Sequence, residues 1–473
     1  MTLKAGSLKT RTKVAYGLGS VAYGIKDGGF GYFFLIFYSQ VMGVSASLVG
    51  LALFLALLFD AFSDPLIGYL SDNTRSRWGR RHPYMYAAVI PIAVAYYFVW
   101  NPPDSLQGNA LFPYMLLMAV LVRTLITLYE IPCSSLIAEL TSDYNERTRL
   151  QSYRFASGWS GGILFTAFSL GVLLVPQENG SSGIFNVEGY GRMGLYAAFV
   201  MVASILICSV GTHRHIPDLH QVAEPLKLSL GRIYRELIET LATRSMAGIM
   251  LVMVFGTIAS GMSAGISFYL STFFWGFTTQ QISLLTVALI FSALISIVLS
   301  PLLSVRFGKK RGAFIVGLSA LLLQPAPVVL RLFGLMPENG DPLLFPIILV
   351  LQILDVGLVI VFQTLAFSMV ADMVEDSEVR TQRRSEGVFF AAINFARKIN
   401  QGLGLVLASS LLTFIQFPTE AVPGAVPQET ITHLGLAYVP ALVVPWTVMM
   451  LCLSLYSINR ARHEDNLRKL GRA

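Results

Sequence analysis

Long apolar stretches, separated by short polar connections, recur from one end of the chain to the other. About 20 consecutive apolar residues are enough for a helix to cross a hydrocarbon core about 30 Å thick. The pattern therefore predicts an all-α membrane protein with twelve transmembrane helices. They are expected near residues 14–42, 47–72, 83–101, 112–140, 151–175, 193–212, 245–275, 281–304, 312–334, 344–372, 385–414 and 434–458.

The connections between these segments alternate in charge: one set is rich in Lys and Arg, and the other has almost none. Because loops rich in Lys and Arg stay on the cytoplasmic side, both termini are expected in the cytoplasm. We expect a multi-pass protein of the plasma membrane, which is the inner membrane in a bacterium. The basic connections contain Arg75, Arg77, Arg80 and Arg81; Arg147 and Arg149; Lys227, Arg232, Arg235 and Arg244; Arg306, Lys309, Lys310 and Arg311; and Arg380, Arg383 and Arg384.

Composition agrees with a membrane protein. Of 473 residues, 54% are hydrophobic and 13% are charged, whereas soluble domains average about 25% charged residues. The net charge of +7 does not indicate a nucleic-acid partner, because the basic residues lie in short loops between apolar segments. Cys133, Cys208 and Cys452 show no metal-type spacing. No nucleophile with a base and no phosphate-binding loop is found, so an enzyme is not expected.

The longest basic connection lies at the midpoint of the chain. It predicts an N-terminal six-helix bundle (1–212), a cytoplasmic middle loop (213–244) and a C-terminal six-helix bundle with a basic tail (245–473). A weak repeat supports two pseudo-symmetric halves, since GYLSDNTRSRWGRRHPY after the second helix resembles PLLSVRFGKKRGAF after the eighth. Transporters built this way bind solute near mid-membrane between the halves, and we expect a monomer. In the middle loop an apolar stripe predicts a surface helix; it comprises Leu230, Ile233, Tyr234, Leu237, Ile238 and Leu241.

Two carboxylates, Asp60 and Asp64, lie four residues apart on the second predicted helix, with Ser63 beside them. A charge at mid-bilayer costs at least about 2.5–3.5 kcal/mol, so it marks a functional candidate. Because two neighbouring carboxylates on one helix face repel each other, they require a cation, a proton or a basic side chain. Oxygen ligands for Na⁺ or Li⁺ would come from Asp60, Asp64, Ser63 and Thr127 if helices two and four pack together. The alternatives are a packing Asp–Lys or Asp–Arg pair, and a Thr127 hydroxyl bonded to its own helix.

Other charges lie at similar depth. On helix four, Arg123, Thr127 and Glu130 share one face, while Arg154 and Lys398 supply positive charge from helices five and eleven.

Lys26 and Asp27 lie near the middle of the first helix. Their side chains leave the helix about 100° apart, so we do not expect either to be the other's only partner. Asp27 is predicted to contact solute and Lys26 to respond to cation binding. A structural ion pair with another helix is the alternative.

At these residues the sequence resembles the glycoside-pentoside-hexuronide:cation symporter family, the group of the melibiose permease within the major facilitator superfamily. The resemblance covers nearly the whole chain. Its motifs are FDAFSDPLIGYLSDNTRSRWGRRHPY (Phe59 to Tyr84), Tyr16-Gly17-Leu18-Gly19, Tyr129-Glu130-Ile131-Pro132, Tyr153-Arg154-Phe155, and Ala371-Asp372 ahead of Lys398.

The resemblance implies a major facilitator fold and assigns roles to residues. The implied cation site comprises Asp60, Ser63, Asp64 and Thr127, with Asp60 and Asp64 as the charged ligands. The implied solute site comprises Lys26, Asp27, Glu130, Arg154 and Gln363, with Lys398 joining the two sites. Na⁺, Li⁺ or H⁺ would be transported, and no resident cofactor is expected.

The sequence departs from the melibiose-type pattern where that permease contacts its sugar. Glu130 replaces an aspartate, and Ser134 and Gln363 replace tryptophans. Since aromatic faces provide stacking platforms, a galactoside is less well supported than other solutes of the wider family, which include pentosides, glucuronides and lysolipids.

These observations lead to a hypothesis of cation-coupled symport of a glycoside or pentoside by alternating access. Arg75, Arg77, Arg80, Arg81 and Asp372 would close the cytoplasmic gate. The alternatives are a cation-coupled carrier of lysolipids or other amphiphiles, and a membrane receptor that binds solute without moving it.

Overall fold

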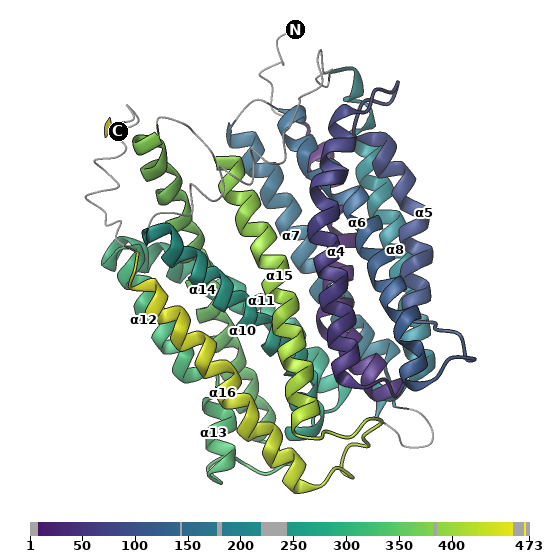
Figure 1. Cartoon of the computed structure of the whole chain (residues 1–473), viewed down its shortest axis with the longest axis vertical. Coiled ribbons are helices and arrows are strands. Elements are labelled where there is room, and N and C mark those ends of the chain that lie inside the picture. The colour runs from purple at the N-terminus through teal and green to yellow at the C-terminus, as the bar shows by residue number, and fades with distance from the viewer. Residues whose placement is uncertain are drawn as a thin grey trace. The chain divides into compact units, whose positions relative to one another are not determined.

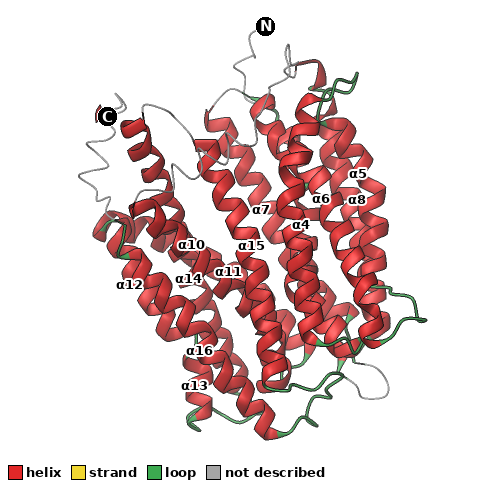
Figure 2. Ribbon diagram, in the orientation of Figure 1, coloured by secondary structure: helices red, strands yellow, loops and turns green. Residues whose placement is uncertain are grey.

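The computed structural model describes residues 8–141, 144–176, 182–218, 244–381, 386–456 and 468–469. Within these ranges every regular element is a helix (Figures 1 and 2). Each of the twelve predicted segments corresponds to one helix or to a continuous series of shorter helices. Ten of the described segments are long and apolar enough to cross a membrane.

The first span is a series of short helices: α1 (Thr10–Leu18), α2 (Ser20–Gly28) and α3 (Phe34–Ile36), with π-helical turns at Gly29–Phe33 and Phe37–Val41. The next five spans are α4 (Ala46–Asn73), α5 (His82–Val99), α6 (Phe112–Leu140), α7 (Tyr144–Phe168) and α8 (Val187–His213). The last six spans are α10 (Arg244–Tyr269), α11 (Thr279–Phe307), α12 (Lys309–Leu323) with α13 (Ala326–Leu332), α14 (Leu344–Thr381), α15 (Glu386–Phe414) and α16 (Gln428–Leu453).

Two predicted helices differ from the observed ones in a way that local chemistry explains. Helix α8 begins six residues before the predicted residue 193, because the Asn186 side chain accepts a 2.9 Å hydrogen bond from the Gly189 amide and caps the helix. The ninth predicted helix is divided into α12 and α13 at Pro325. Proline has no amide hydrogen to continue the helical bonding.

By their internal contacts the residues fall into two compact units. Unit 1 comprises Met1–Leu226, Thr278–Val287 and Pro418–Ala425, and unit 2 comprises Lys227–Phe277, Ala288–Phe417 and Val426–Ala473. Most of the predicted middle loop, including its apolar stripe, lies outside the described residues. The division at 213–244 therefore stays a prediction.

In each unit, the first and fifth spans pack through glycines. A Cβ added to Gly24 on α2 would lie 2.0 Å from the Gly158 carbonyl oxygen on α7, and one added to Gly162 would lie 2.7 Å from the Gly24 carbonyl oxygen. In unit 2, a Cβ added to Gly404 on α15 would lie 2.9 Å from the Gly261 Cα on α10. Small residues of this kind let membrane helices approach backbone to backbone.

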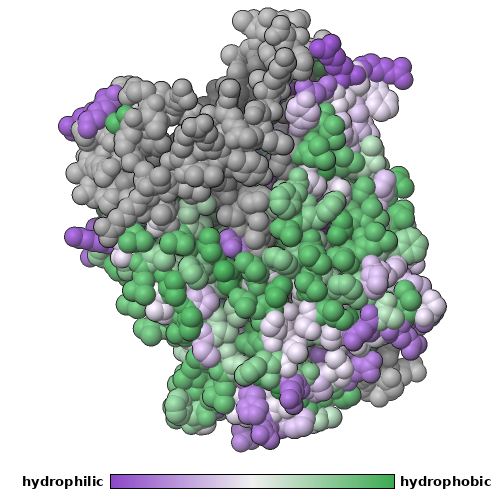
Figure 3. Space-filling model, in the orientation of Figure 1, coloured by the Kyte–Doolittle hydropathy of each residue, from purple (hydrophilic) through white to green (hydrophobic). Residues whose placement is uncertain are grey.

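Large apolar side chains cover the outward faces of the helices. Figure 3 shows hydrophobic residues gathered along the middle of the helices and hydrophilic residues toward their ends. Examples of exposed apolar residues are Phe199 and Val210 on α8 and Ile297 and Val298 on α11. An apolar surface of this extent belongs in lipid, not in water.

Candidate cation and solute site

The predicted cation ligands meet where α4 packs along α6 within unit 1. The Thr127 hydroxyl donates a 2.7 Å hydrogen bond to Asp60 Oδ1 and lies 3.1 Å from Asp64 Oδ1. A hydroxyl has one hydrogen, so it donates fully to only one of these carboxylates at a time. Thr127 therefore links the two acidic side chains across the helices, and its hydroxyl is not directed to its own helix.

Ser63 completes this group of oxygen atoms on α4. Its hydroxyl donates a 3.1 Å hydrogen bond to the Asp60 carbonyl oxygen, which leaves the Ser63 oxygen able to accept or to ligate. Asp60, Ser63 and Thr127 are buried, and Asp64 is half-buried. Carboxylate and hydroxyl oxygens are the ligands that hard cations prefer, so this donor set is of the kind that binds a hard cation.

A basic residue, Arg123, stands beside this group on α6. Its Nη1 atom lies 3.6 Å from Asp60 Oδ2, and both side chains are almost fully buried. Its guanidinium carbon lies 5.0 Å from the centre of the Phe30 ring. The Asp–Arg pair that the sequence left open as an alternative is therefore present for Asp60.

Lys26 and Asp27 pair with each other, and Lys26 has a second contact with an aromatic ring. Both lie in α2, and the Lys26 ammonium bonds directly to the carboxylate of Asp27. The lysine stem is long enough to bend back, and its ammonium also lies 4.1 Å from the centre of the Tyr23 ring. The Lys26 side chain is 3% exposed and that of Asp27 is 53% exposed. Asp27 therefore presents an accessible carboxylate within the first span.

Arg154 on α7 and Glu130 on α6 form an ion pair. Arg154 also donates a 3.4 Å hydrogen bond to the Ser20 hydroxyl on α2, and its guanidinium carbon lies 5.8 Å from the centre of the Tyr16 ring. The Tyr16 hydroxyl in turn donates a 2.8 Å hydrogen bond to the Cys133 carbonyl oxygen. The Tyr-Gly-Leu-Gly and Tyr-Arg-Phe motifs thus place one network of polar contacts between the first, fourth and fifth spans.

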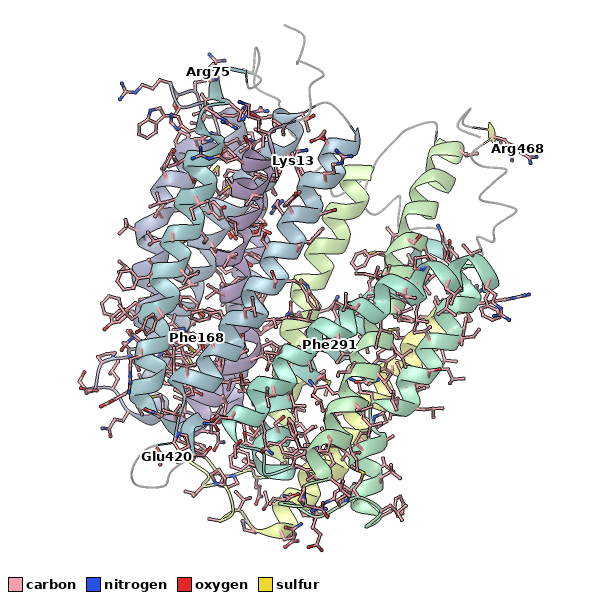
Figure 4. All side chains as sticks on the ribbon, turned by 180° about the vertical axis from the view of Figure 1, so that it is seen from behind. Lys13, Arg75, Phe168, Phe291, Glu420 and Arg468 are labelled. Carbon is pink, nitrogen blue, oxygen red and sulfur yellow. The ribbon has the colours of Figure 1, made fainter. Side chains whose placement is uncertain are left out.

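The predicted gate arginines have a partner that the sequence did not reveal. Arg80 Nη2 lies 2.8 Å, and Arg81 Nε 3.0 Å, from Glu139 Oε1 near the end of α6, while Arg81 also donates a 2.9 Å bond to the Ser71 hydroxyl. The sequence does contain a signal for this partner: Glu139 is an acidic residue near the end of the fourth predicted span, where a basic connection follows. Arg75 lies at the same end of unit 1 as Lys13 (Figure 4). The side chain of Asp372 lies outside the described residues, so its gate role stays a prediction.

Gln363 and Lys398 belong to unit 2. Gln363 is exposed on α14, and the Lys398 side chain lies outside the described residues. Ser134, at a tryptophan position of the melibiose-type pattern, donates a 2.9 Å hydrogen bond to the Ile131 carbonyl oxygen of its own helix.

The structure also relates two cysteines that the sequence showed only as isolated thiols. Cys133 and Cys208 are both buried, with their sulfur atoms 3.7 Å apart. The part of the chain that the structure describes contains no group of three or more His, Cys, Asp or Glu residues able to hold a metal ion.

The sequence matches the family described as MFS/sugar transport protein over residues 15–460. The chain belongs to this family. The match confirms the resemblance stated from the motifs, and it makes the chain a multi-pass membrane transporter and not an enzyme.

Known relatives cover almost the same length. The chain is 26% identical to the putative glycoside/cation symporter YagG of Escherichia coli (strain K12), over 98% of this chain and 95% of that protein. It is 25% identical to the sodium-dependent lysophosphatidylcholine symporter 1 of Mus musculus, over 99% of this chain and 89% of that protein. The crystal structure of the nucleoside transporter NupG is similar with a TM-score of 0.61 and 14% identity, covering 95% of this chain and 98% of that one. The predicted twelve-helix major facilitator fold is thereby confirmed.

Proposed function

We propose that the protein is a cation-coupled symporter that carries a glycoside or pentoside by alternating access. The observation that carries the proposal is the pair of carboxylates, Asp60 and Asp64, joined through the Thr127 hydroxyl where two membrane spans pack. Negative groups are costly inside a membrane. A site that concentrates two of them and supplies further oxygen atoms suits a positive ion that enters and leaves.

In this mechanism the cation neutralises the repulsion between Asp60 and Asp64 and makes the loaded site stable within the bilayer. Ionised Asp27 and Glu130 are acceptors for sugar hydroxyl hydrogens, while Lys26 and Arg154 hold these two carboxylates in place. Coupling must be reciprocal, so bound solute tightens cation binding by the same factor by which the cation tightens solute binding.

Further parts of the proposal concern the second half and the cell. Gln363 and Lys398 contact the solute from the C-terminal bundle, and the cytoplasmic gate uses Arg75, Arg77, Arg80, Arg81 and Asp372. The protein works as a monomer in the inner membrane with both termini in the cytoplasm.

The cation site is tested by uptake into proteoliposomes with and without an inward sodium gradient, repeated with lithium and with a proton gradient. Asp60→Ala and Asp64→Ala are expected to abolish gradient-driven uptake. Asp104→Asn, which changes an exposed loop carboxylate, is the matched control and should transport normally. Gradient-driven uptake that survives Asp60→Ala would refute the proposed coupling site.

The solute class is tested with the same vesicles. Because the Mus musculus relative is a lysophosphatidylcholine symporter, a lysolipid is the second candidate. Radiolabelled pentosides and glycosides are compared with a lysophospholipid, and saturable, cation-stimulated uptake of the sugar alone supports the proposal. Solute binding without counterflow would instead indicate a receptor.

A further inference from the structure

We propose that residues Pro418–Ala425 form a strap that Gln40 holds on unit 1 and that leaves unit 1 in one state of the transport cycle. The inference rests on the proposed alternating access, and it adds Gln40 as a positioning residue that sets the balance between the two states. Glu420, within the strap, lies at the opposite end of unit 1 from Lys13 and Arg75 (Figure 4).

The strap belongs to a different unit from the helices that it connects. Helices α15 and α16 lie in unit 2, whereas Pro418–Ala425, in the connection between them, belongs to unit 1 by its contacts. The change occurs between two consecutive residues, since Phe417 still belongs to unit 2. Phe417 is buried there, and its ring centre lies 5.4 Å from that of Tyr269 and 5.0 Å from that of Phe273. This short stretch of chain therefore has one attachment in each unit.

The attachment in unit 1 is made by both ends of the Gln40 side-chain amide. Its Nε2 atom donates a 3.1 Å hydrogen bond to the Pro418 carbonyl oxygen, and its Oε1 atom accepts a 2.9 Å hydrogen bond from the Ala421 amide. Gln40 lies in the π-helical turn at the end of the first span and is 3% exposed. A glutamine amide carries both donors and an acceptor, so one side chain satisfies a main-chain acceptor and a main-chain donor of the strap.

Glu420 shows that the strap is strained while it is bound. Its φ angle of 54° lies in the left-handed region, which residues other than glycine adopt uncommonly. Its carboxylate lies against Gly43, where an added Cβ would be 2.7 Å from Glu420 Oε1. Conformations of this kind cost free energy and persist only where surrounding contacts impose them. Release of the strap would relieve this strain.

The attachment through Gln40 is the weaker of the two. In alternating access the two halves of a transporter rock against each other, so a strap attached in both units has to give way at one attachment. Exposing the buried ring of Phe417 to water would be costly, because aromatic side chains bury a large apolar area. The two hydrogen bonds of Gln40 can be exchanged for bonds to water at a small net cost. The strap should therefore separate from Gln40.

A second segment from the C-terminal part of the chain also belongs to unit 1 by its contacts. It comprises Thr278–Val287, at the start of α11. The Ser283 hydroxyl in this segment donates a 2.7 Å hydrogen bond to the Ala167 carbonyl oxygen, next to the end of α7. Here too a polar side chain bonds a main-chain group. Such contacts suit a closure that forms and breaks in every cycle, because water can replace each hydrogen bond.

Release of the strap is tested on the purified full-length protein by electron–electron distance measurements between spin labels at Met42→Cys and Val422→Cys, with and without sodium. Cys452, which is half-buried, is replaced by serine. Gln40→Met keeps a long side chain in the buried position but removes both hydrogen bonds. It should raise the ratio of released to bound strap at least about tenfold. Gln107→Met, which changes an exposed loop glutamine, is the matched control and should give the wild-type ratio.

The same two cysteines show whether release is required for transport. Joining them with a short, reducible bis-thiosulfonate reagent should abolish gradient-driven uptake into proteoliposomes, and a reductant should restore it. Each single-cysteine variant treated with the reagent is the control. If Gln40→Met does not fold, Glu420→Asn replaces it. Asparagine adopts the left-handed conformation more readily than glutamate, so this variant should shift the ratio toward the bound strap.

Failure of this inference is distinguishable from failure of the proposed function. A spin-label distance that neither Gln40→Met nor Glu420→Asn changes overturns the role of Gln40. Full uptake by the cross-linked protein overturns the need for release, and the symport then stands. If the ratio responds to Gln40→Met but the wild type takes up no solute under any cation gradient, Gln40 does hold the strap and the symport is wrong.

Discussion

Thr127 and Asp60 join two membrane spans through a hydrogen bond of 2.7 Å, with the hydroxyl of α6 as donor and the carboxylate of α4 as acceptor. A hydrogen bond to a charged group contributes about 1.5–3 kcal/mol. Thr127→Ala is therefore expected to weaken sodium binding by about 10- to 100-fold. Thr127→Ser keeps the hydroxyl and is the matched control. Equal affinities in these two variants, measured by calorimetry, would show that the hydroxyl takes no part in binding.

The glycine contact between α2 and α7 predicts a steric effect that depends strongly on position. Gly24→Ala places a methyl group 2.0 Å from the Gly158 carbonyl oxygen, whereas a Cβ at Gly31 meets nothing within 4 Å. Forcing extra atoms into a packed interface costs about 1–3 kcal/mol or more. Gly24→Ala should lower the melting temperature and the yield of monodisperse protein, and Gly31→Ala should change neither. A Gly24→Ala protein as stable as the Gly31→Ala control would contradict the close approach.

The buried cluster around Glu139 predicts a large loss of stability on neutralisation. Glu139→Gln leaves Arg80 and Arg81 without their carboxylate, and removing one partner of a buried pair costs about 3–5 kcal/mol. Glu188 pairs with Arg192 on an exposed surface, where such a pair contributes about 0–1 kcal/mol. Glu188→Gln is thus the control. Thermal unfolding in detergent should separate the two variants clearly, and matching melting temperatures would refute the role of Glu139.

The pair formed by Lys13 and Glu146 predicts a dependence of stability on pH. The Lys13 ammonium lies 2.8 Å from Glu146 Oε2, and its hydrogen bond lowers the pKa of the Glu146 carboxyl below the ordinary value. A carboxyl whose pKa is lower in the folded state stabilises the fold above its unfolded pKa, and this contribution is lost as the pH falls through the folded pKa.

Melting temperatures of the wild type and Glu146→Gln should accordingly differ at neutral pH and converge on acidification. Glu188→Gln again serves as the control, because its carboxyl is exposed. A difference between wild type and Glu146→Gln that is constant over the whole pH range would rule out this linkage.

The helices and the shared face of Asp60 and Asp64 were predictable from the sequence for a physical reason. A sufficiently long apolar stretch indicates a membrane span directly, and a four-residue spacing places Asp60 and Asp64 on one helix face whatever surrounds that helix. The pairing of Arg80 and Arg81 with Glu139 was not predictable, because it depends on which spans become neighbours. The direct contact between Lys26 and Asp27 was not specifically predicted for another reason: helix geometry fixes the direction in which a side chain leaves the backbone, and the flexible lysine stem decides where its ammonium lies.

The contact of Gly24 with Gly158 and Gly162 also bears on how unit 1 can move. Where main chains touch without intervening side chains, neither helix can slide or rotate against the other without a steric clash, and no rotamer change relieves it. Helices α2 and α7 therefore behave as one rigid pair. Any flexing of unit 1 falls on helices whose contacts are made by adjustable side chains, and Arg154 on α7 and the Ser20 hydroxyl that it contacts on α2 move together with this pair.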